Sequence, residues 1–145
     1  MATNPAAIAV QAFRVPAERV YDAILDPDMI ARFMFGPLLR EETILHIHND
    51  LRVGGQFSYK VQRGEHVIDH VGEYRELDRP RRIVFTWGVA GEGDGEPSVV
   101  SIDITATPEG CRLTLTHEMP AEWADFIDRS RAAWEKMLGV LATLL

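Results

Sequence analysis

The chain has 145 residues, of which 46% are hydrophobic and 26% are charged, and this composition is ordinary for one globular domain with a sizeable core. Its formal net charge of −7 argues against nucleic acid as a partner, because phosphate binding needs a basic face. No apolar run is long enough to span a membrane, Met1–Ala7 lacks the features of a signal peptide, and a single cysteine, Cys111, fits a reducing compartment, so we expect a cytoplasmic protein.

The N-terminal part of the chain predicts one strand followed by two short helices. Apolar and polar residues alternate from Ile8 to Val15, as in a strand with one buried face. Pro16–Leu25 then has the spacing of a helix with one apolar face. Asp26-Pro27 has the pattern of an N-cap followed by proline in the first turn, so a second helix is expected to about Phe33, where Gly36-Pro37 follows to end it.

The middle of the chain, up to His117, predicts strands separated by turn-rich segments. The Gly54-Gly55 pair indicates a bulge or a sharp bend within one of them. The loop Gly91–Pro97 is rich in glycine but acidic, and it lacks the lysine of a phosphate-binding loop, so we expect a mobile hairpin loop. The six predicted strands are Thr43–His48, Leu51–Val61, His66–Leu77, Arg82–Val89, Val99–Thr107 and Cys111–His117.

The last stretch, Pro120 to Leu145, predicts a long amphipathic helix. Apolar residues recur at steps of three and four, and charged residues take the opposite face. At 1.5 Å per residue the helix would be roughly 35 Å long, enough to cross a small domain. Its predicted apolar face consists of Trp123, Phe126, Ile127, Trp134, Met137, Leu138, Leu141 and Leu145.

This apolar face has a gap at Ser130 and Ala133, two small residues between Ile127 and Trp134. A well-packed interior places a large side chain at such a position. Either a bulky side chain from the opposing surface fills the space, or a cavity lies under the middle of the helix. The sequence leaves both alternatives open.

The order of the elements indicates an α+β fold in a single domain, residues 1–145. Consecutive strands with short connections form an antiparallel meander, and such a sheet twists and curls. Only the terminal helix is long enough to fill the concave face. Alternation along four of the strands predicts these inward-facing residues: Phe57, Tyr59, Val61, Ile83, Phe85, Trp87, Val100, Ile102, Ile104, Leu113, Leu115 and His117.

Segments along nearly the entire chain match the pattern of one known family. They are Val15–Tyr21, Leu25–Pro27, Ala31–Phe33, Asp50–Phe57, Gly72–Tyr74, Arg81–Trp87, and Trp134 with Leu138 and Leu141. They resemble the START-like (SRPBCC) superfamily, and in particular the branch named after the activator of heat-shock protein 90 ATPase. The resemblance implies a helix-grip fold like that of birch pollen allergen, in which about seven antiparallel strands curl around the long C-terminal helix.

The sequence departs from the usual pattern of that family beside the predicted cavity. Ser130 and Ala133 stand where the family often has histidine and glycine, and Phe33 replaces a frequent tryptophan. A ligand therefore does not carry over from the resemblance. The family includes binders of hydrophobic small molecules, aromatic polyketide cyclases and a eukaryotic co-chaperone domain, so its fold does not fix one function.

The candidate site is a ligand cavity between the terminal helix and the sheet. Small-molecule sites are concave and apolar with a few polar groups, and Tyr and His suit such walls because each has an apolar body and a hydrogen-bonding tip. The same aromatic residues fit a plain core at least as well. The predicted lining is Phe33, Phe35, Phe57, Tyr59, His70, Tyr74, Trp87, His117, Trp123, Phe126, Ile127 and Ser130.

The histidines are the residues with the most chemical potential. His70 and His117 are candidates for acid–base catalysis because histidine titrates near neutrality, but a hydrogen-bonded core histidine is the simpler interpretation of each, so no catalytic residue is assigned. His46 and His48 share a face of a predicted edge strand. No third ligand with zinc spacing accompanies them, so we expect no metal and no cofactor.

Three functions are compatible with these observations. The favoured one is binding of a small hydrophobic or aromatic molecule without a reaction. The second is an enzyme of the polyketide cyclase or hydrolase kind, with His70 or His117 as the acid–base group and Tyr59 or Tyr74 as a hydrogen-bond donor. The third is a co-chaperone that stimulates a chaperone ATPase, as the family name implies. The sequence also leaves a homodimer open.

Overall fold

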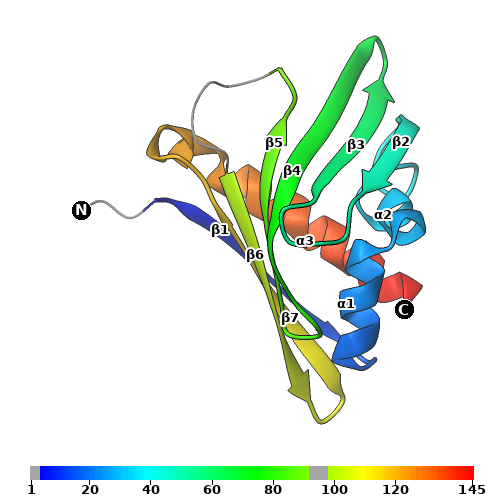
Figure 1. The fold of residues 1–145 in the computed structure, drawn as a ribbon, viewed down its shortest axis with the longest axis vertical. Coiled ribbons are helices and arrows are strands. Elements are labelled where there is room, and N and C mark those ends of the chain that lie inside the picture. Colours follow the sequence, from blue (N-terminus) through cyan, green and yellow to red (C-terminus); the bar gives the residue numbers. More distant parts are fainter. Residues whose placement is uncertain (1–3, 92–97) are drawn as a thin grey trace.

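Seven antiparallel strands form one curved sheet in the computed structural model, which describes residues 4–91 and 98–145 (Figure 1). The strand order is β1-β7-β6-β5-β4-β3-β2, so β1 and β2 are the two edges. This confirms the predicted meander; residues 92–97 of the predicted hairpin loop lie outside the described residues. The strands are β1 (Ala6–Phe13), β2 (Thr43–Asn49), β3 (Gln56–Arg63), β4 (His66–Asp78), β5 (Arg82–Val89), β6 (Ser98–Thr107) and β7 (Gly110–Glu118).

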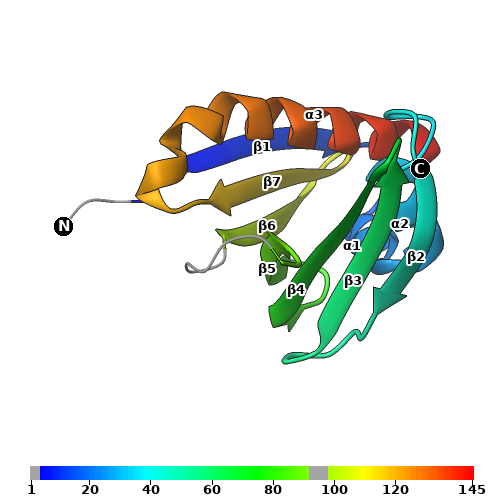
Figure 2. The same cartoon turned by 90° about the horizontal axis from the view of Figure 1, so that it is seen from above.

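The helices lie on the concave side of the sheet. They are α1 (Ala17–Leu25), α2 (Pro27–Phe33), the 3₁₀-helix η1 (Ala121–Phe126) and α3 (Ile127–Leu144). Asp26 caps α2 as predicted, because its Oδ1 accepts a hydrogen bond from the backbone amide of Asp28 at 2.9 Å. Figure 2 shows α3 lying along β1, with α1 and α2 inside the curve near its C-terminal end. Together these elements form the helix-grip fold. Among the described residues, none of the helices has the length and apolar character needed to cross a lipid bilayer.

The terminal helix begins later than the sequence predicts. Ala121–Phe126 form a 3₁₀-helix, which has three residues per turn, so the spacing that places residues on one α-helical face does not apply there. Trp123 and Phe126 are consequently 46% and 43% exposed, and the prediction that they continue the apolar face was wrong. The buried residues of α3 are Trp134, Leu138 and Leu141.

Strand β3 also begins later than predicted, at Gln56 instead of Leu51. The Gly54-Gly55 pair forms a sharp bend, and Gly54 adopts a φ of +86°, a conformation that favours glycine. The Gly54 amide donates to the Tyr74 carbonyl at 2.8 Å, and the Tyr74 amide donates to the Gly55 carbonyl at 2.9 Å. The bend therefore replaces the first residues of the predicted strand, and two backbone hydrogen bonds connect it to β4.

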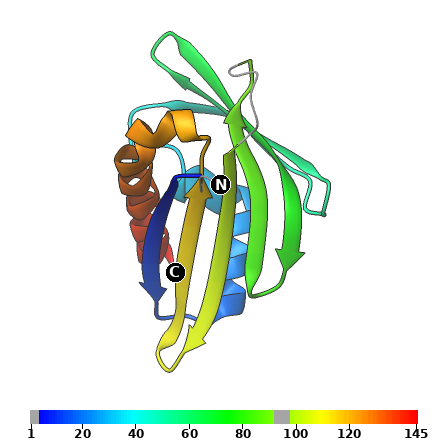
Figure 3. The same ribbon diagram turned by 90° about the vertical axis from the view of Figure 1, so that its left-hand side faces the viewer.

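The core lies between α3 and the inner face of the sheet. All of the predicted inward-facing residues are buried except Trp87, which is half-buried. On β1 the small Ala7 and Ala9 are buried, and this leaves room for α3 to lie close over that strand. Figure 3 shows the green strands β3 and β4 across the curve from α3, so the sheet bends away from the helix toward its β2 edge. The space between them is where the site lies.

Gly72 on β4 allows the aromatic residues on the inner face to pack, and its replacement tests that packing. A methyl group at this position would clash with the Thr86 carbonyl oxygen and with the ring of Phe57, its partner on β3. We expect Gly72→Ala to lower the free energy of unfolding by about 2–3 kcal/mol, as overpacking of a core does. Urea denaturation followed by tryptophan fluorescence measures this change.

The matched control is Gly88→Ala on the neighbouring strand β5. An added methyl group at Gly88 meets nothing within 4 Å. Its effect on the free energy of unfolding should stay within about 0.5 kcal/mol. Equal losses in the two variants would contradict the role assigned to Gly72.

Candidate functional site

A small apolar cavity lies between α3 and the sheet. The volume open to the centre of a water-sized sphere is about 20 Å³, which is room for about one water molecule. Its walls come from α1, α2, α3 and five strands, and from Met34, which follows α2. They are Ile24, Leu25, Phe33, Met34, Phe57, Tyr59, Tyr74, Phe85, Trp87, Ile102, Leu115, Trp134 and Leu138.

The structure brings together only part of the predicted lining. Phe33, Phe57, Tyr59, Tyr74 and Trp87 line the cavity. Phe35, His70 and His117 are buried but are not among its walls, and Ile127 and Ser130 are half-buried outside it. Trp123 and Phe126 are exposed, so they do not line an internal cavity.

The gap in the apolar face of α3 is closed where Ser130 lies. The Sδ atom of Met119, a buried residue that follows β7, lies 3.9 Å from Ser130 Oγ. A bulky side chain from the opposing surface therefore occupies the space beside Ser130, which is the first of the two alternatives left open by the sequence. The cavity itself lies further along the helix, against Trp134 and Leu138.

Trp87 is the centre of the aromatic residues around the cavity. Its ring centroid lies 5.3 Å from that of His70, 5.6 Å from that of Trp134 and 5.9 Å from that of Phe57. Such separations are typical of favourable aromatic pairs. The residue is nevertheless only half-buried, so part of it stays in contact with solvent.

A polar cluster forms one wall of the cavity. Asn49 Oδ1 accepts hydrogen bonds from the hydroxyls of Tyr74 at 2.5 Å and Tyr59 at 3.4 Å, and the two hydroxyls lie 3.2 Å apart. The Asn49 Nδ2 group donates to the Leu25 carbonyl at 2.9 Å, which fixes the orientation of the amide. Burial raises the pKa of both tyrosines, so both hydroxyls are neutral donors. Asn49 is not recognisable as a site residue from the sequence, because an asparagine between His48 and Asp50 resembles an ordinary turn residue.

His117 belongs to a chain of hydrogen bonds that links α3 to three strands. Trp134 Nε1 donates to His117 Nδ1 at 3.1 Å, His117 Nε2 lies 2.8 Å from Ser98 Oγ, and Ser98 Oγ donates to the Trp87 carbonyl at 2.6 Å. Since the serine gives its only proton to the carbonyl, it accepts from Nε2, and the imidazole is the neutral Nε2–H tautomer. Both ring nitrogens are used, so His117 has no free nitrogen for acid–base chemistry.

His70 keeps one nitrogen for other interactions. Its Nδ1 lies 3.1 Å from the Tyr59 carbonyl, which can only accept, so Nδ1 carries the proton. Burial lowers the pKa of His70 despite this hydrogen bond, so the ring is neutral near physiological pH. The ring packs between Phe35, at a centroid distance of 5.0 Å, and Trp87. His70, on β4, therefore packs against Trp87, which lines the cavity, without lining the cavity itself.

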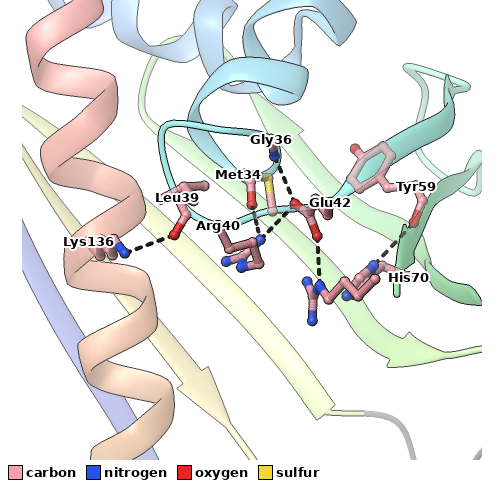
Figure 4. A network of polar contacts seen from close by, with 9 residues as sticks. Met34, Gly36, Leu39, Arg40, Glu42, Tyr59, His70 and Lys136 are labelled. Atoms are coloured by element: carbon pink, nitrogen blue, oxygen red, sulfur yellow. Dashed lines mark hydrogen bonds and ion pairs between the residues drawn. The ribbon is translucent and has the colours of Figure 1, made fainter. Parts of the chain in front are cut away.

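A buried carboxylate lies beside His70 (Figure 4). The side chain of Glu42 has no exposed surface and accepts hydrogen bonds from Arg40 at 2.9 Å, Arg63 at 2.7 Å and the Gly36 amide at 2.8 Å. Burial would raise its pKa, but the hydrogen bonds from Arg63 and Gly36 and the two positive charges lower it below the ordinary value. Glu42 is therefore an anion held by two guanidinium groups.

The predicted histidine pair on the edge strand β2 is present. The rings of His46 and His48 stack at a centroid distance of 4.3 Å, and His46 Nε2 lies 2.7 Å from Ser58 Oγ. Ser58 in turn donates to Asp69 at 2.6 Å. Within residues 4–91 and 98–145, no group of three or more His, Cys, Asp or Glu side chains has the arrangement of a metal site.

A second hollow lies on the surface, where β7 meets η1. It measures about 310 Å³ and is lined by residues such as Glu118, Pro120 and Glu122. None of the aromatic residues named above and no buried polar cluster borders it. The interior cavity is therefore the better candidate site, although it is much smaller.

Comparisons with known proteins agree with the helix-grip fold. Residues 14–145 match the family described as activator of Hsp90 ATPase homolog 1-like protein. A protein from Chromobacterium violaceum has 25% identity and a TM-score of 0.77, over 96% of this chain and 95% of that one. An AHSA1-like protein from Aeromonas hydrophila has 21% identity and a TM-score of 0.76, over 96% and 90%. A Staphylococcus aureus protein described as of unknown function has 17% identity and a TM-score of 0.79, over 97% and 95%. No curated protein matches the chain.

The hydrogen-bonded state of His117 predicts a dependence of stability on pH. Burial lowers its pKa from 6.5 to about 4, so as the pH falls the unfolded chain takes up a proton before the folded protein does. The stabilisation is fully present above pH 6.5 and is lost as the pH falls through 4, by about 3 kcal/mol in total. We expect His117→Gln to flatten this part of the stability curve, since the amide can replace both hydrogen bonds but does not titrate.

Urea denaturation across this pH range measures the slope for the wild type and the variant. His66→Gln, which replaces an exposed histidine on β4, is the control and should leave the slope unchanged. An unchanged slope in His117→Gln would show that the histidine is not held neutral by the fold.

Proposed function

The chain belongs to the family of activator of Hsp90 ATPase homolog 1-like proteins, and within that family we propose that it binds a small molecule with an apolar or aromatic body between α3 and the sheet. The observation that carries the proposal is the incompletely buried Trp87 amid the aromatic rings of the concave face. Tryptophan is highly buried on average but seldom covered completely, so the surface of Trp87 that stays open is available to a ligand. An apolar guest that stacked on Trp87 would complete its burial.

The chemistry of the walls supports such a guest. Most of the lining is aliphatic or aromatic, and the hydroxyls of Tyr59 and Tyr74 supply a hydrogen-bonding group at one place. Binding sites for small molecules combine a mostly apolar surface with a few fixed polar groups in this way. The Asn49 amide holds both hydroxyls and so sets the position of the polar group before a ligand arrives.

The present cavity of about 20 Å³ accepts only a water-sized guest, so a ligand must displace side chains. Met34 is well suited to move, because methionine has three rotatable bonds and fills irregular gaps. When a ligand binds only to molecules whose cavity is already open, its apparent affinity is reduced in proportion to the fraction of such molecules. The proposal therefore predicts modest affinity for simple apolar molecules and a measurable gain when space is created.

The enzyme hypothesis receives less support than binding. Both nitrogens of His117 are engaged with Trp134 and Ser98, and the imidazole of His70 is not a wall of the cavity. A general base needs a free nitrogen within reach of the substrate. We assign no reaction to the site.

Leu138 offers a direct test of binding in this cavity. It lines the cavity from α3 and is 2% exposed, and Leu138→Ala should cost about 3 kcal/mol of stability while enlarging the space. We expect the neutral fluorophore N-phenyl-1-naphthylamine to bind the wild type weakly and Leu138→Ala several-fold more tightly. Enhancement of its fluorescence on titration with protein gives the affinity.

The control is Leu113→Ala, which removes the same atoms from a fully buried leucine of β7 that is not part of the cavity wall. It should lose similar stability but bind the fluorophore as the wild type does. If the fluorophore does not bind the wild type, or if both variants gain affinity equally, the cavity is not a ligand site.

Stimulation of an Hsp90-type ATPase is the alternative function, and the family description suggests it. The feature that favours a protein contact is the exposed pair Trp123 and Phe126, whose rings lie 5.6 Å apart on η1. Exposed aromatic residues are enriched at interfaces. If this alternative holds, the protein raises the ATPase rate of the cognate chaperone severalfold, and Trp123→Ser abolishes the effect while Ile8→Ser, at another exposed apolar residue, does not. An unchanged ATPase rate would rule it out.

A further inference from the structure

The inner face of β3 changes from apolar to basic along its length. Alternation puts Phe57, Tyr59, Val61 and Arg63 on the same face of this strand. The first three are buried, and the first two line the cavity. Arg63 ends the row, with a side chain that is 35% exposed. The concave surface thus leads from the cavity to a guanidinium group at the end of the strand.

Arg63 forms a cluster of ion pairs with Arg40 and Glu42. One carboxylate faces two guanidinium groups, so the cluster carries a formal charge of +1, in a chain whose net charge is −7. Arg63 binds Glu42 through Nε, and Arg40 uses one terminal nitrogen for both Glu42 and the Met34 carbonyl. In the part of the chain that the structure describes, the terminal nitrogens of Arg63 donate to no protein acceptor. Those N–H groups can bind a second anion.

The cluster adjoins the aromatic residues through His70. Figure 4 shows Glu42 between Arg40, on the segment after α2, and His70 on β4. The ring of His70 lies 5.3 Å from that of Trp87, which lines the cavity. A molecule on Trp87 can therefore extend past His70 toward the two arginines.

We infer that the ligand is an amphiphilic monocarboxylate whose anionic head binds Arg63 and Arg40 and whose apolar body lies against Trp87. The inference rests on the proposed function, because the apolar body occupies the cavity described there. One negative charge neutralises the cluster, and a guanidinium group matches the geometry of a carboxylate with two parallel N–H donors. Arg63 lies four residues from Tyr59, roughly 13 Å along an extended strand, and this distance suits a medium-length chain.

The test compares decanoate with decanol, which has the same chain and no charge near neutral pH. Isothermal titration calorimetry gives both affinities for the wild-type protein. We expect decanoate to bind about tenfold or more tightly than decanol, since hydrogen bonds between charged groups are stronger than neutral ones. Added salt should weaken the binding of decanoate and leave that of decanol unchanged.

Arg63→Gln should reduce the affinity for decanoate about tenfold and leave the affinity for decanol unchanged. Arg40→Gln is the second variant should the first fail to fold, with folding checked by circular dichroism. The matched control is Arg82→Gln on β5, which removes an arginine of similar exposure (37%) that is paired with Glu76 and Asp103. It should change neither affinity.

The outcomes separate this inference from the function on which it rests. Equal affinities of the wild type for decanoate and decanol would overturn the inference and leave the apolar site intact. Binding of neither probe would overturn both. A preference for decanoate that survives both arginine variants would show that Arg40 and Arg63 only hold Glu42.

Discussion

The hydrogen-bond chain from Trp134 through His117 and Ser98 to the Trp87 carbonyl joins α3 to β7, β6 and β5 at the level of the cavity. Whether each group in this series donates or accepts is set by its neighbours, so all of the hydrogen bonds form only when the imidazole of His117 is neutral. A buried polar group that lacks a partner costs free energy. Because α3 can satisfy these groups in only one position relative to the sheet, the hydrogen bonds fix that position, whereas apolar contacts alone would let the helix slide. The position of Trp87, and with it the shape of the cavity, depends on this connection.

The second constraint acts from the opposite wall, where Asn49 holds Tyr59 and Tyr74. Its amide is oriented by the Leu25 carbonyl at the end of α1, so the edge strand β2, the inner strands and the helix pair meet at one group. The two polar systems flank an apolar interior without entering it. They position the aromatic rings while leaving the interior free of charge, and this is the arrangement that an apolar guest requires.

Much of this architecture can be predicted from the sequence, because alternation and helical spacing depend only on neighbouring residues. The buried rows on β3, β5, β6 and β7 and the cap at Asp26 are examples. The prediction was wrong at Trp123 and Phe126, since the same spacing fits an α-helix and does not reveal a 3₁₀ turn. Asn49 could not be identified from the sequence because its partners lie 10, 24 and 25 residues away. The pairing of Glu42 with Arg63 likewise becomes visible only when β2 and β3 are in register.

The segment that follows α2 connects the apolar and the charged parts of the site. Met34 lines the cavity with its side chain, and its carbonyl accepts a hydrogen bond from Arg40. Two residues later the Gly36 amide donates to Glu42, and the Leu39 carbonyl accepts from Lys136 on α3. Met34 therefore links the wall of the cavity to the segment that carries Arg40 and Glu42. Because the same few residues form the wall and support the guanidinium groups, the two contacts proposed for the ligand fall on one short segment of the chain, and a molecule that made both would couple them through that segment.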